Sequence, residues 1–350
     1  MVNQEIVIDF SPPALPDLDE EQMQVVDALD KEEHILVVGV PATGKTRLIE
    51  ACTFHLLAKN IDSDEILPRA FETSARDVMQ ERIGAAGVKA YTYHGFGAST
   101  ESRRRAFLEG GAINFDRLLD SRTEKERERT WTLGDEGQSL TAQQYLSFLS
   151  WSRFHLLVGD PYQSIFKWAG ADPRLMDGFR DDFCSGKAHY LHINYRSGSE
   201  IVEYAEKVYK RGMVAARDGG LVKELTRVYP TELFKGEQLT ILARYTEQLE
   251  EMRRNVLIKY KIPHTFTRFK KDGGREVVNY TEQDLIVGKV IKKRKEYLPV
   301  HLMTIHCAKG DEWNNVLILK WNMLQAREED KHIWYVGITR PKEKLYVRSE

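Results

Sequence analysis

Residues 39–46 read GVPATGKT, which is a complete phosphate-binding loop pattern. A short apolar run, HILVVG at 34–39, precedes the loop, and a helical pattern over about 46–59 follows it. Gly39 and Gly44 would let the backbone turn so that its N–H groups face phosphate oxygens, and the helix N-terminus adds a favourable field. The alternative is a glycine turn before an ordinary helix, which leaves the complete pattern unexplained. The loop therefore predicts a nucleotide site.

The side chains around this loop suit phosphate chemistry with a metal ion. Lys45 would reach the β- and γ-phosphates, and the hydroxyl of Thr46 would bind Mg²⁺. An acidic pair, Asp135 and Glu136, lies in LGDEGQS at 133–139. Asp135 would hold the metal ion together with Thr46, and Glu136 would orient and deprotonate the attacking water. An exposed acidic turn is the alternative for the pair, because the preceding RTWTL is only a weak strand pattern.

The overall charge does not identify a substrate. The 350-residue chain carries 51 basic and 53 acidic side chains, for a net charge of −2. This balance argues against binding of DNA by bulk charge, but a local basic groove needs only a few side chains. The length allows two or three domains.

Strand and helix patterns alternate along the chain and predict an α/β fold with mostly parallel sheets. Helical patterns cover 198–210 and 246–260, among others. Besides 34–39, further apolar runs predict buried strands at 154–159, 189–193, 238–243, 300–305, 315–320 and 344–349.

Two highly charged segments interrupt these patterns. The first contains SRRRAF and TEKERER, and the second contains RFKKDGGREV and KKRKEY. Both are poor in strand patterns, so we expect two short insertions, at 98–130 and 267–299. The remainder predicts a first core domain of 1–97 plus 131–187 and a second of 188–266 plus 300–350.

Composition predicts a cytoplasmic protein with no membrane partner. No apolar run approaches the ~18–20 residues that span a bilayer. The opening residues lack the basic region and apolar core of a signal peptide. Cys52, Cys184 and Cys307 lie far apart and fit no disulfide or zinc pattern, which favours a reducing compartment.

The order of the motifs from about residue 18 to the C-terminus resembles the UvrD/Rep/PcrA branch of superfamily 1 helicases. The resemblance implies two tandem RecA-like P-loop domains, each with a parallel sheet and a short insertion. The most specific segment is VGDPYQSIFKWAGAD at 158–172. The other motifs beside the loop and the acidic pair are LDEEQ at 18–22, INYRSGSE at 193–200, TIHCAKGDEW at 304–313 and YVGITRPK at 335–342.

The resemblance implies one ATP site that uses side chains from both core domains. Gln22 would read the adenine, Tyr195 would stack on it, and Glu312 would contact the sugar. At the phosphate end, Gln163 would sense the γ-phosphate, and Gln138 would connect the nucleotide to the rest of the site. Two arginine fingers, Arg196 and Arg340, would stabilise the transition state. The loop residues expected to bind the nucleotide are Gly39, Pro41, Ala42, Thr43, Gly44, Lys45, Thr46 and Arg47.

The resemblance also implies a binding surface for single-stranded DNA. Phe166 and Trp168 would stack on bases, although aromatic residues in general pack more often in a core. The segment after Phe71, an expected aromatic contact, departs from the family: its polar and lysine residues are replaced here by Glu72, Thr73 and Ser74. The further DNA contacts expected are Phe71, Thr92, His94, Arg244, Thr304 and His306.

These motifs predict an ATP-dependent DNA helicase or translocase that acts on single-stranded DNA and at junctions with duplex DNA. The family resemblance implies movement in the 3′→5′ direction, which the residue chemistry alone does not give. Members of the family carry a long insertion in each core domain, so the short insertions here suggest a reduced motor that a replication or repair protein assists. The expected localisation is cytoplasmic and nucleoid-associated, and the small size would suit a phage or mobile-element protein. Three alternatives stay open. They are a translocase that separates no strands, a P-loop ATPase or kinase indifferent to DNA, and an inactive binding module. Intact Lys45, Glu136, Arg196 and Arg340 argue against the last.

Overall fold

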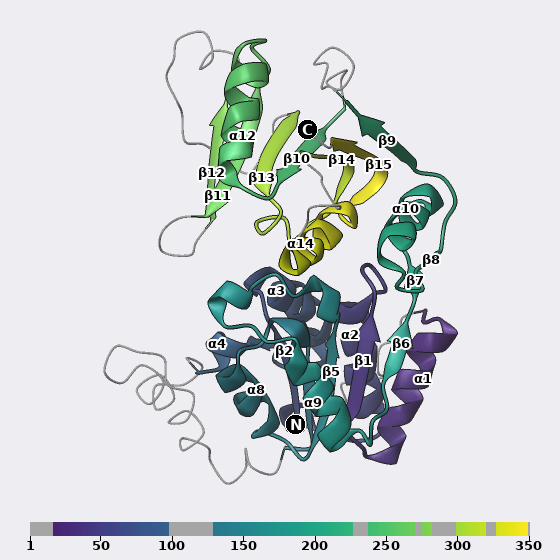
Figure 1. Ribbon diagram of the computed structural model, residues 1–350. Helices are drawn as coiled ribbons and strands as arrows, with labels where there is room; N and C mark the ends of the chain where they lie inside the picture. The colour runs from purple at the N-terminus through teal and green to yellow at the C-terminus, as the bar shows by residue number, and fades with distance from the viewer. Residues whose placement is uncertain are drawn as a thin grey trace, which may run out of the picture. The chain divides into compact units, whose positions relative to one another are not determined.

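The computed structural model divides the chain into two compact units (Figure 1). The residues that it describes are 17–97, 129–226, 237–269, 275–281, 299–319 and 327–348. The first unit comprises Met1–Gly39, Gly44–Pro161 and Phe166–Leu191, and the second comprises Val40–Thr43, Tyr162–Ile165 and His192–Glu350. Two short loop segments, 40–43 and 162–165, are thus grouped with the second unit.

The first unit is built on an all-parallel sheet with the strand order β3-β2-β4-β5-β1-β6. In the central register, Leu156 of β5 is aligned with Ile35 of β1 on one side and with Leu133 of β4 on the other. The carboxyl ends of β1, β4 and β5 therefore lie at one edge of the sheet. The strands are β1 (Ile35–Gly39), β2 (Ile66–Ala70), β3 (Tyr91–Thr92), β4 (Trp131–Gly134), β5 (Phe154–Gly159) and β6 (His189–Leu191).

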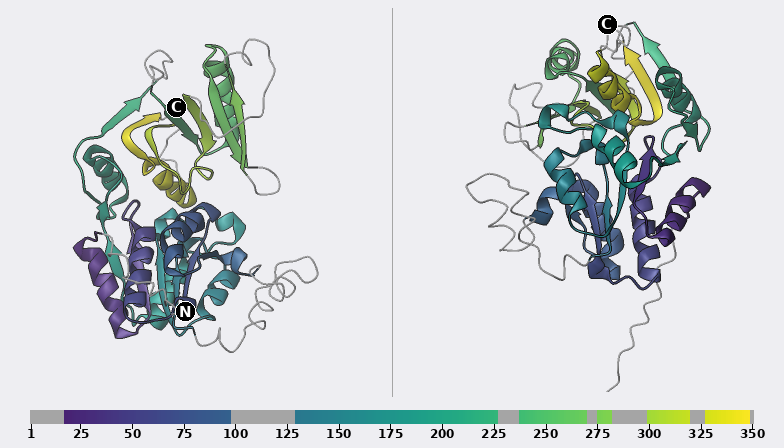
Figure 2. Two further views of the ribbon diagram at one scale, coloured as in Figure 1. Left: turned by 180° about the vertical axis from the view of Figure 1, so that it is seen from behind. Right: turned by 60° about the horizontal axis from the view of Figure 1, so that its bottom comes forward.

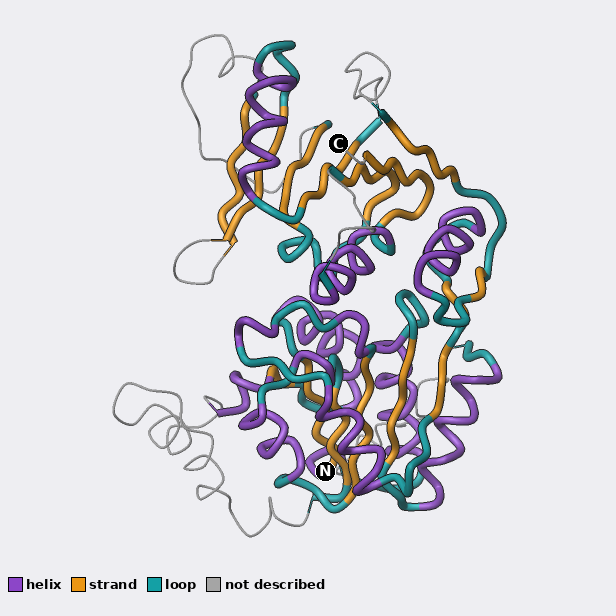
Figure 3. The backbone as a smooth tube through the Cα atoms, in the orientation of Figure 1, coloured by secondary structure: helices purple, strands orange, loops and turns teal. Residues whose placement is uncertain are grey.

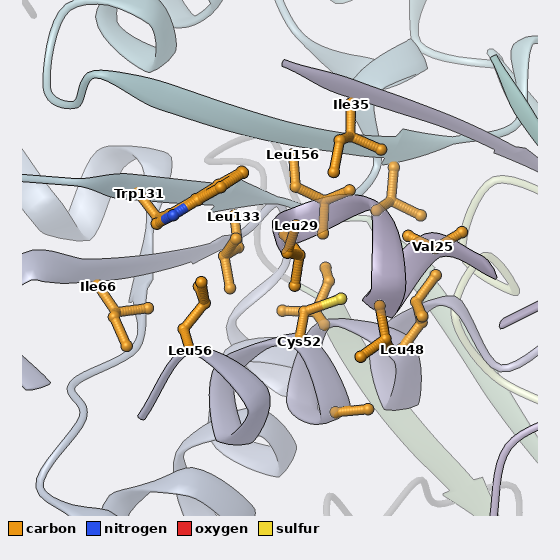
Figure 4. Packing of buried hydrophobic residues seen from close by; sticks show 14 of the residues in the cluster. Val25, Leu29, Ile35, Leu48, Cys52, Leu56, Ile66, Trp131, Leu133 and Leu156 are labelled. Atoms are coloured by element: carbon orange, nitrogen blue, oxygen red, sulfur yellow. The ribbon is translucent and has the colours of Figure 1, made fainter. Parts of the chain in front are cut away.

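Helices cover both faces of this sheet, which explains why its strands are continuously apolar. On one face, side chains of α1 (Glu20–Ala28), α2 (Lys45–Ala58) and α3 (Thr73–Ile83) pack with Ile35, Leu133 and Leu156 (Figure 4). On the other face, α4 (Tyr93–Gly97), α8 (Ala142–Leu149) and α9 (Arg174–Phe183) pack against Leu36 and Leu157. Figures 2 and 3 show these helices around the strands. Short 3₁₀ helices lie at Leu29–Lys31, Ser63–Glu65, Gly84–Ala86, Gly137–Ser139, Pro161–Gln163 and Lys167–Ala169.

The second unit is built on a larger sheet with the order β12-β11-β13-β10-β14-β15-β9, in which β12 alone runs antiparallel to its neighbour among the described strands. Its helices are α10 (Ser199–Tyr209), α12 (Thr246–Met252), which continues as a π-helix over Arg253–Ile258, and α14 (Glu328–Ile338). A separate pair is formed by β7 (Ile193–Asn194) and β8 (Val214–Ala215). The sheet strands are β9 (Leu221–Leu225), β10 (Leu239–Ala243), β11 (His264–Phe269), β12 (Arg275–Tyr280), β13 (Val300–Thr304), β14 (Trp313–Ile318) and β15 (Pro341–Arg348).

The α/β class with two mostly parallel sheets is confirmed, and the strands expected from apolar runs are present. The predicted boundary at residue 188 cuts off β6, whose pairing with β1 places it in the first sheet. The division falls after Leu191 instead. The segment predicted as an insertion at 267–299 contains more strand than its charged sequence suggested, because its first residues end β11 and its charged stretch at 275–280 is the edge strand β12. Nearly all of the predicted insertion at 98–130 lies outside the described residues.

None of the helices within the described ranges combines the length and the apolar character needed to cross a membrane.

Candidate nucleotide and nucleic-acid site

The phosphate loop joins β1 to α2 with two residues in the left-handed region. Gly44 has φ 74° and caps α2, and Ala42 has φ 64°, which is uncommon for a residue with a side chain. The ammonium group of Lys45 is buried and donates to the carbonyl of Gly39 at 3.0 Å. The start of α2 therefore presents helix N–H groups and a lysine at one place, which is the arrangement that binds phosphate.

Thr46 and Asp135 meet at the carboxyl edge of the first sheet. The Thr46 hydroxyl donates to Oδ2 of Asp135 at 2.9 Å, although 89 residues separate the two in sequence. Asp135 is 2% exposed. Burial and the neighbouring Glu136 raise the pKa of Asp135 above its usual range, against the opposing effects of Thr46 and Lys45. A hydroxyl and a carboxylate are the hard oxygen ligands that Mg²⁺ takes, so this pair fits the expected metal ion.

Glu136 is held in a specific orientation beside this pair. Its φ of 58° is left-handed, a backbone strain that clusters at functional sites. Its N–H donates to Oδ1 of Asp135 at 2.8 Å, and its carboxylate accepts from Nε2 of Gln138 at 2.6 Å. Gln138 in turn accepts from the N–H of Asp160 at 2.9 Å. The predicted connecting residue Gln138 therefore ties the acidic pair to the end of β5.

Gln22 lies against the phosphate loop. Its side chain is 3% exposed and closes a capping box with Asp19 at the start of α1. A Cβ atom on Gly44 would come within 3.0 Å of Gln22 Nε2, so the amide reaches the loop. The structure thus brings the expected adenine-reading residue next to the expected phosphate-binding residues.

Three aromatic side chains of the first unit lie in series. Phe71 stacks on Phe166 with ring centroids 6.0 Å apart, and Phe166 meets Trp168 edge to face at 6.2 Å. Phe71 and Phe166 are half-buried, whereas Trp168 is 70% exposed. An exposed tryptophan supported by a second ring is a surface on which a nucleobase could stack.

The other DNA contacts predicted in the first unit lie around the start of α4. The Thr92 hydroxyl accepts from the N–H of Gly95 at 2.7 Å, and exposed His94 is 3.4 Å from the side-chain amide of Gln144. Tyr93, between them, is fully buried and was not predicted from the sequence. The only sequence signal for Tyr93 was its place between two predicted contacts.

Two residues with separate predicted roles, Arg196 and Glu312, form an ion pair in the second unit. Nε of Arg196 lies 2.5 Å from Oε2 of Glu312, and Nη1 donates to the carbonyl of Thr339 at 3.1 Å. Burial alone would raise the pKa of Glu312, but Lys342 and Arg196 together outweigh it and hold the pKa below its usual value. A carboxylate thus keeps the predicted arginine finger in one orientation.

Arg340 and Gln163 also meet within the second unit, which includes residues 162–165. Arg340 is 3% exposed, and Nη2 donates to the Gln163 side-chain oxygen at 3.3 Å. The guanidinium group also donates to the carbonyls of Val336 and Asp311 at 2.9 and 3.3 Å. The expected γ-phosphate sensor and the expected second arginine are therefore brought together.

Tyr195 lies beside the loop segment 40–43, which belongs to the same unit. Its N–H donates to the carbonyl of Ala42 at 3.0 Å, and the side chain of Asn194 donates to Pro41 at 3.1 Å. The ring of Tyr195 is 46% exposed, as a stacking surface for adenine would be.

The DNA contacts predicted in the second unit lie at the ends of β10 and β13, which pair in parallel. Arg244 forms a 2.9 Å ion pair with Asp330 and lies 4.8 Å from the Tyr245 ring centroid. Thr304 and His306 are half-buried, and burial lowers the pKa of His306 to about 4, so its ring is neutral at neutral pH. The three residues share one edge of the sheet, with Arg244 already engaged by a carboxylate.

Family comparisons agree with both units of this arrangement. A model described as an AAA domain matches residues 22–169, and a model described as a UvrD-like helicase C-terminal domain matches residues 281–349. The chain belongs to the UvrD-like superfamily 1 helicases. Membership of this family accounts for a phosphate loop and an acidic pair that precede a second sheet with two arginine-containing motifs.

Curated relatives of this chain are distant and longer. A probable DNA helicase of Mycoplasma pneumoniae is 25% identical over 244 residues, covering 63% of this chain and 43% of that protein. The ATP-dependent DNA helicase PcrA of Staphylococcus epidermidis is 29% identical over 190 residues, or 47% of this chain and 26% of that protein. The chain thus spans less than half the length of these relatives. Among solved structures, a PRRSV helicase overlaps with a TM-score of 0.48 and an arterivirus nonstructural protein 10 helicase with 0.49, both at 12% identity. The overlap covers 94% of this chain in each case, and 54% and 61% of those chains.

A substitution at Gly159 tests whether the end of β5 lies close against Gly137 and Gln138, the residues that follow the acidic pair. A Cβ atom there would lie 2.5 Å from the Gln138 side-chain oxygen and 3.0 Å from the backbone nitrogen of Gly137. We expect Gly159→Ala to lower the free energy of unfolding by about 1–3 kcal/mol through overpacking, measured by urea unfolding. Gly178→Ala is the matched control, because a Cβ atom at helical Gly178 meets nothing within 4 Å. Equal unfolding midpoints for the two variants would contradict the close approach.

Proposed function

We propose that this chain hydrolyses ATP with Mg²⁺ and couples hydrolysis to movement along single-stranded DNA. One observation carries the proposal. The unit that holds the start of α2 and the acidic pair also presents exposed Trp168, whose ring meets Phe166, which in turn stacks on Phe71. A nucleotide site explains the first feature, and base stacking explains the second.

In the proposed reaction, Lys45 and the start of α2 bind the β- and γ-phosphates, and Gln22 orients the base. Thr46 and Asp135 hold Mg²⁺, which neutralises phosphate charge when bound with ATP. Glu136, oriented by Gln138, takes the proton of the attacking water. The hydrogen bonds of Glu136 support this role because they hold its backbone and its carboxylate in place before the substrate binds.

The family resemblance leads us to propose that the second unit completes catalysis. Arg196 and Arg340 would stabilise the charge of the transferred phosphoryl group, and Tyr195 would stack on the adenine. Gln163 would report the presence of the γ-phosphate to Arg340, its hydrogen-bond partner. Because ATP and its products differ in charge at this point, hydrolysis would change which conformation is favoured.

For DNA, we propose that bases stack on Trp168 and Phe166, and that Thr92, His94, Arg244, Thr304 and His306 contact the strand. Stacking tolerates every base, as a motor that steps along any sequence requires. Arg244 would have to exchange its contact with Asp330 for a phosphate. Movement in the 3′→5′ direction, strand separation and assistance by a replication or repair partner are further parts of the proposal.

Loss of the phosphate-binding lysine tests the nucleotide site. We expect Lys45→Ala to lower the ATP hydrolysis rate by about a hundredfold or more, because it removes charge stabilisation at the phosphates. Lys59→Ala is the control, since Lys59 lies just past the other end of the same helix and its side chain is 53% exposed. Wild-type hydrolysis in Lys45→Ala would remove the phosphate loop from the mechanism.

Single-stranded DNA should stimulate hydrolysis, and Trp168 should set the DNA concentration required. With a stacked base worth ~1–3 kcal/mol, Trp168→Ala should raise the half-stimulating concentration of an oligo(dT) by roughly 5- to 150-fold. Trp168→Phe should restore most of the affinity. Tyr190→Ala, at a tyrosine that is 51% exposed in β6, is the control. A hydrolysis rate indifferent to DNA would leave a P-loop ATPase and refute the motor.

Duplexes with a single-stranded tail on one side only test direction and strand separation together. We expect displacement from a duplex with a 3′ tail on the loading strand and about tenfold less from one with a 5′ tail, as a directional motor requires. Release of a bound protein block from single strands without duplex displacement would identify a translocase that separates no strands. Displacement from 5′ tails alone would overturn the proposed direction.

A further inference from the structure

Tyr93 lies between two predicted DNA contacts, yet its side chain turns into the first unit. Thr92 is half-buried and His94 exposed, whereas Tyr93 is 0% exposed. Its hydroxyl donates to the backbone carbonyl of Asp135 at 3.4 Å. A Cβ atom on Gly134 would lie 2.6 Å from that hydroxyl, so the phenol also packs directly on the residue before Asp135.

Arg69 contacts both Asp135 and Tyr93. The backbone carbonyl of Arg69 accepts the N–H of Asp135 at 2.9 Å. Its guanidinium carbon lies 4.7 Å from the centroid of the Tyr93 ring, and Nη2 donates to the Tyr93 carbonyl at 3.4 Å. The backbone N–H of Asp135 is therefore bound by Arg69, which also holds Tyr93, and the backbone carbonyl of Asp135 is bound by Tyr93 itself.

The residue that fixes Tyr93, Arg69, is a buried cation, and its burial costs free energy. Arg69 is 0% exposed, and burial lowers its pKa to about 10, so it remains charged at neutral pH. Its guanidinium is anchored by the carbonyl of Ser147 at 3.2 Å and by that residue's hydroxyl at 3.3 Å. A buried cation is expensive unless hydrogen bonds and aromatic faces compensate it. These contacts leave the Thr92–His94 segment and Asp135 packed as one connected group.

We propose that Tyr93 is the positioning residue through which bound single-stranded DNA accelerates ATP hydrolysis. DNA that contacts Thr92 and His94 shifts the backbone on either side of Tyr93. The buried ring cannot move independently, so its hydroxyl transmits the shift to the carbonyl of Asp135 and thereby to the carboxylate that meets Thr46. This inference rests on the proposed function, since it needs both a DNA contact and a hydrolytic site.

The test is Tyr93→Phe, which keeps the ring and removes only the hydroxyl. Hydrolysis is measured with and without saturating oligo(dT), and the half-stimulating DNA concentration is measured separately. We expect the ratio of stimulated to basal rate to fall roughly three- to tenfold, as loss of one hydrogen bond allows. The half-stimulating concentration should stay within about twofold, because the DNA contacts themselves are intact.

Tyr145→Phe is the matched control, because Tyr145 on α8 packs against the same hydrophobic cluster as Tyr93. It should leave the stimulation ratio unchanged. A wild-type ratio in Tyr93→Phe, or an equal fall of basal and stimulated rates, would overturn the coupling role while leaving the motor intact. Absence of stimulation in the wild-type chain would instead refute the proposed function and this inference with it.

Discussion

The hydrogen bond between Thr46 and Asp135 is the contact on which the rest of the first unit depends. It joins the first turn of α2, the helix that follows β1, to the residue after β4, and β5 lies between these two strands in the sheet. The contact requires the three strands to end at one edge in register, which the parallel pairing of Ile35, Leu156 and Leu133 provides. Burial of a carboxylate costs free energy unless partners compensate it, and the surrounding hydrogen-bond donors and the expected metal ion would do so for Asp135.

The exit of β5 links the nucleotide site to the aromatic series. The N–H of Asp160 donates to the side-chain oxygen of Gln138 there, and Gly159 leaves room for this contact because any side chain would collide with Gln138. Only a few residues later the same segment supplies Gln163, Phe166 and Trp168. One short stretch of chain thus carries a contact to the acidic pair, the expected γ-phosphate sensor and the base-stacking rings. A displacement of this segment caused by the nucleotide phosphates would therefore reach the proposed DNA surface along a few residues of backbone.

Features encoded locally were predictable from the sequence. The phosphate loop needs particular residues at fixed spacing, and the apolar runs of buried parallel strands are visible without a structure. The strand β2 was harder because ILPRA carries proline and arginine, and β9 because LVKEL is mostly exposed. The pairing of Arg196 with Glu312, and the enclosure of Tyr93 by Arg69, depend on residues far apart in sequence. No pattern within one segment predicts such contacts, since tertiary packing decides them.

The most direct test of the whole account is the affinity for single-stranded DNA in different nucleotide states. The dissociation constant of a fluorescent oligo(dT) would be measured by anisotropy without nucleotide, with a non-hydrolysable ATP analogue and with ADP. We expect the dissociation constants with the ATP analogue and with ADP to differ by about fivefold or more, because a motor must couple the binding of nucleotide to the binding of DNA. Equal dissociation constants in all three states would contradict that coupling, even if the chain bound both ligands tightly.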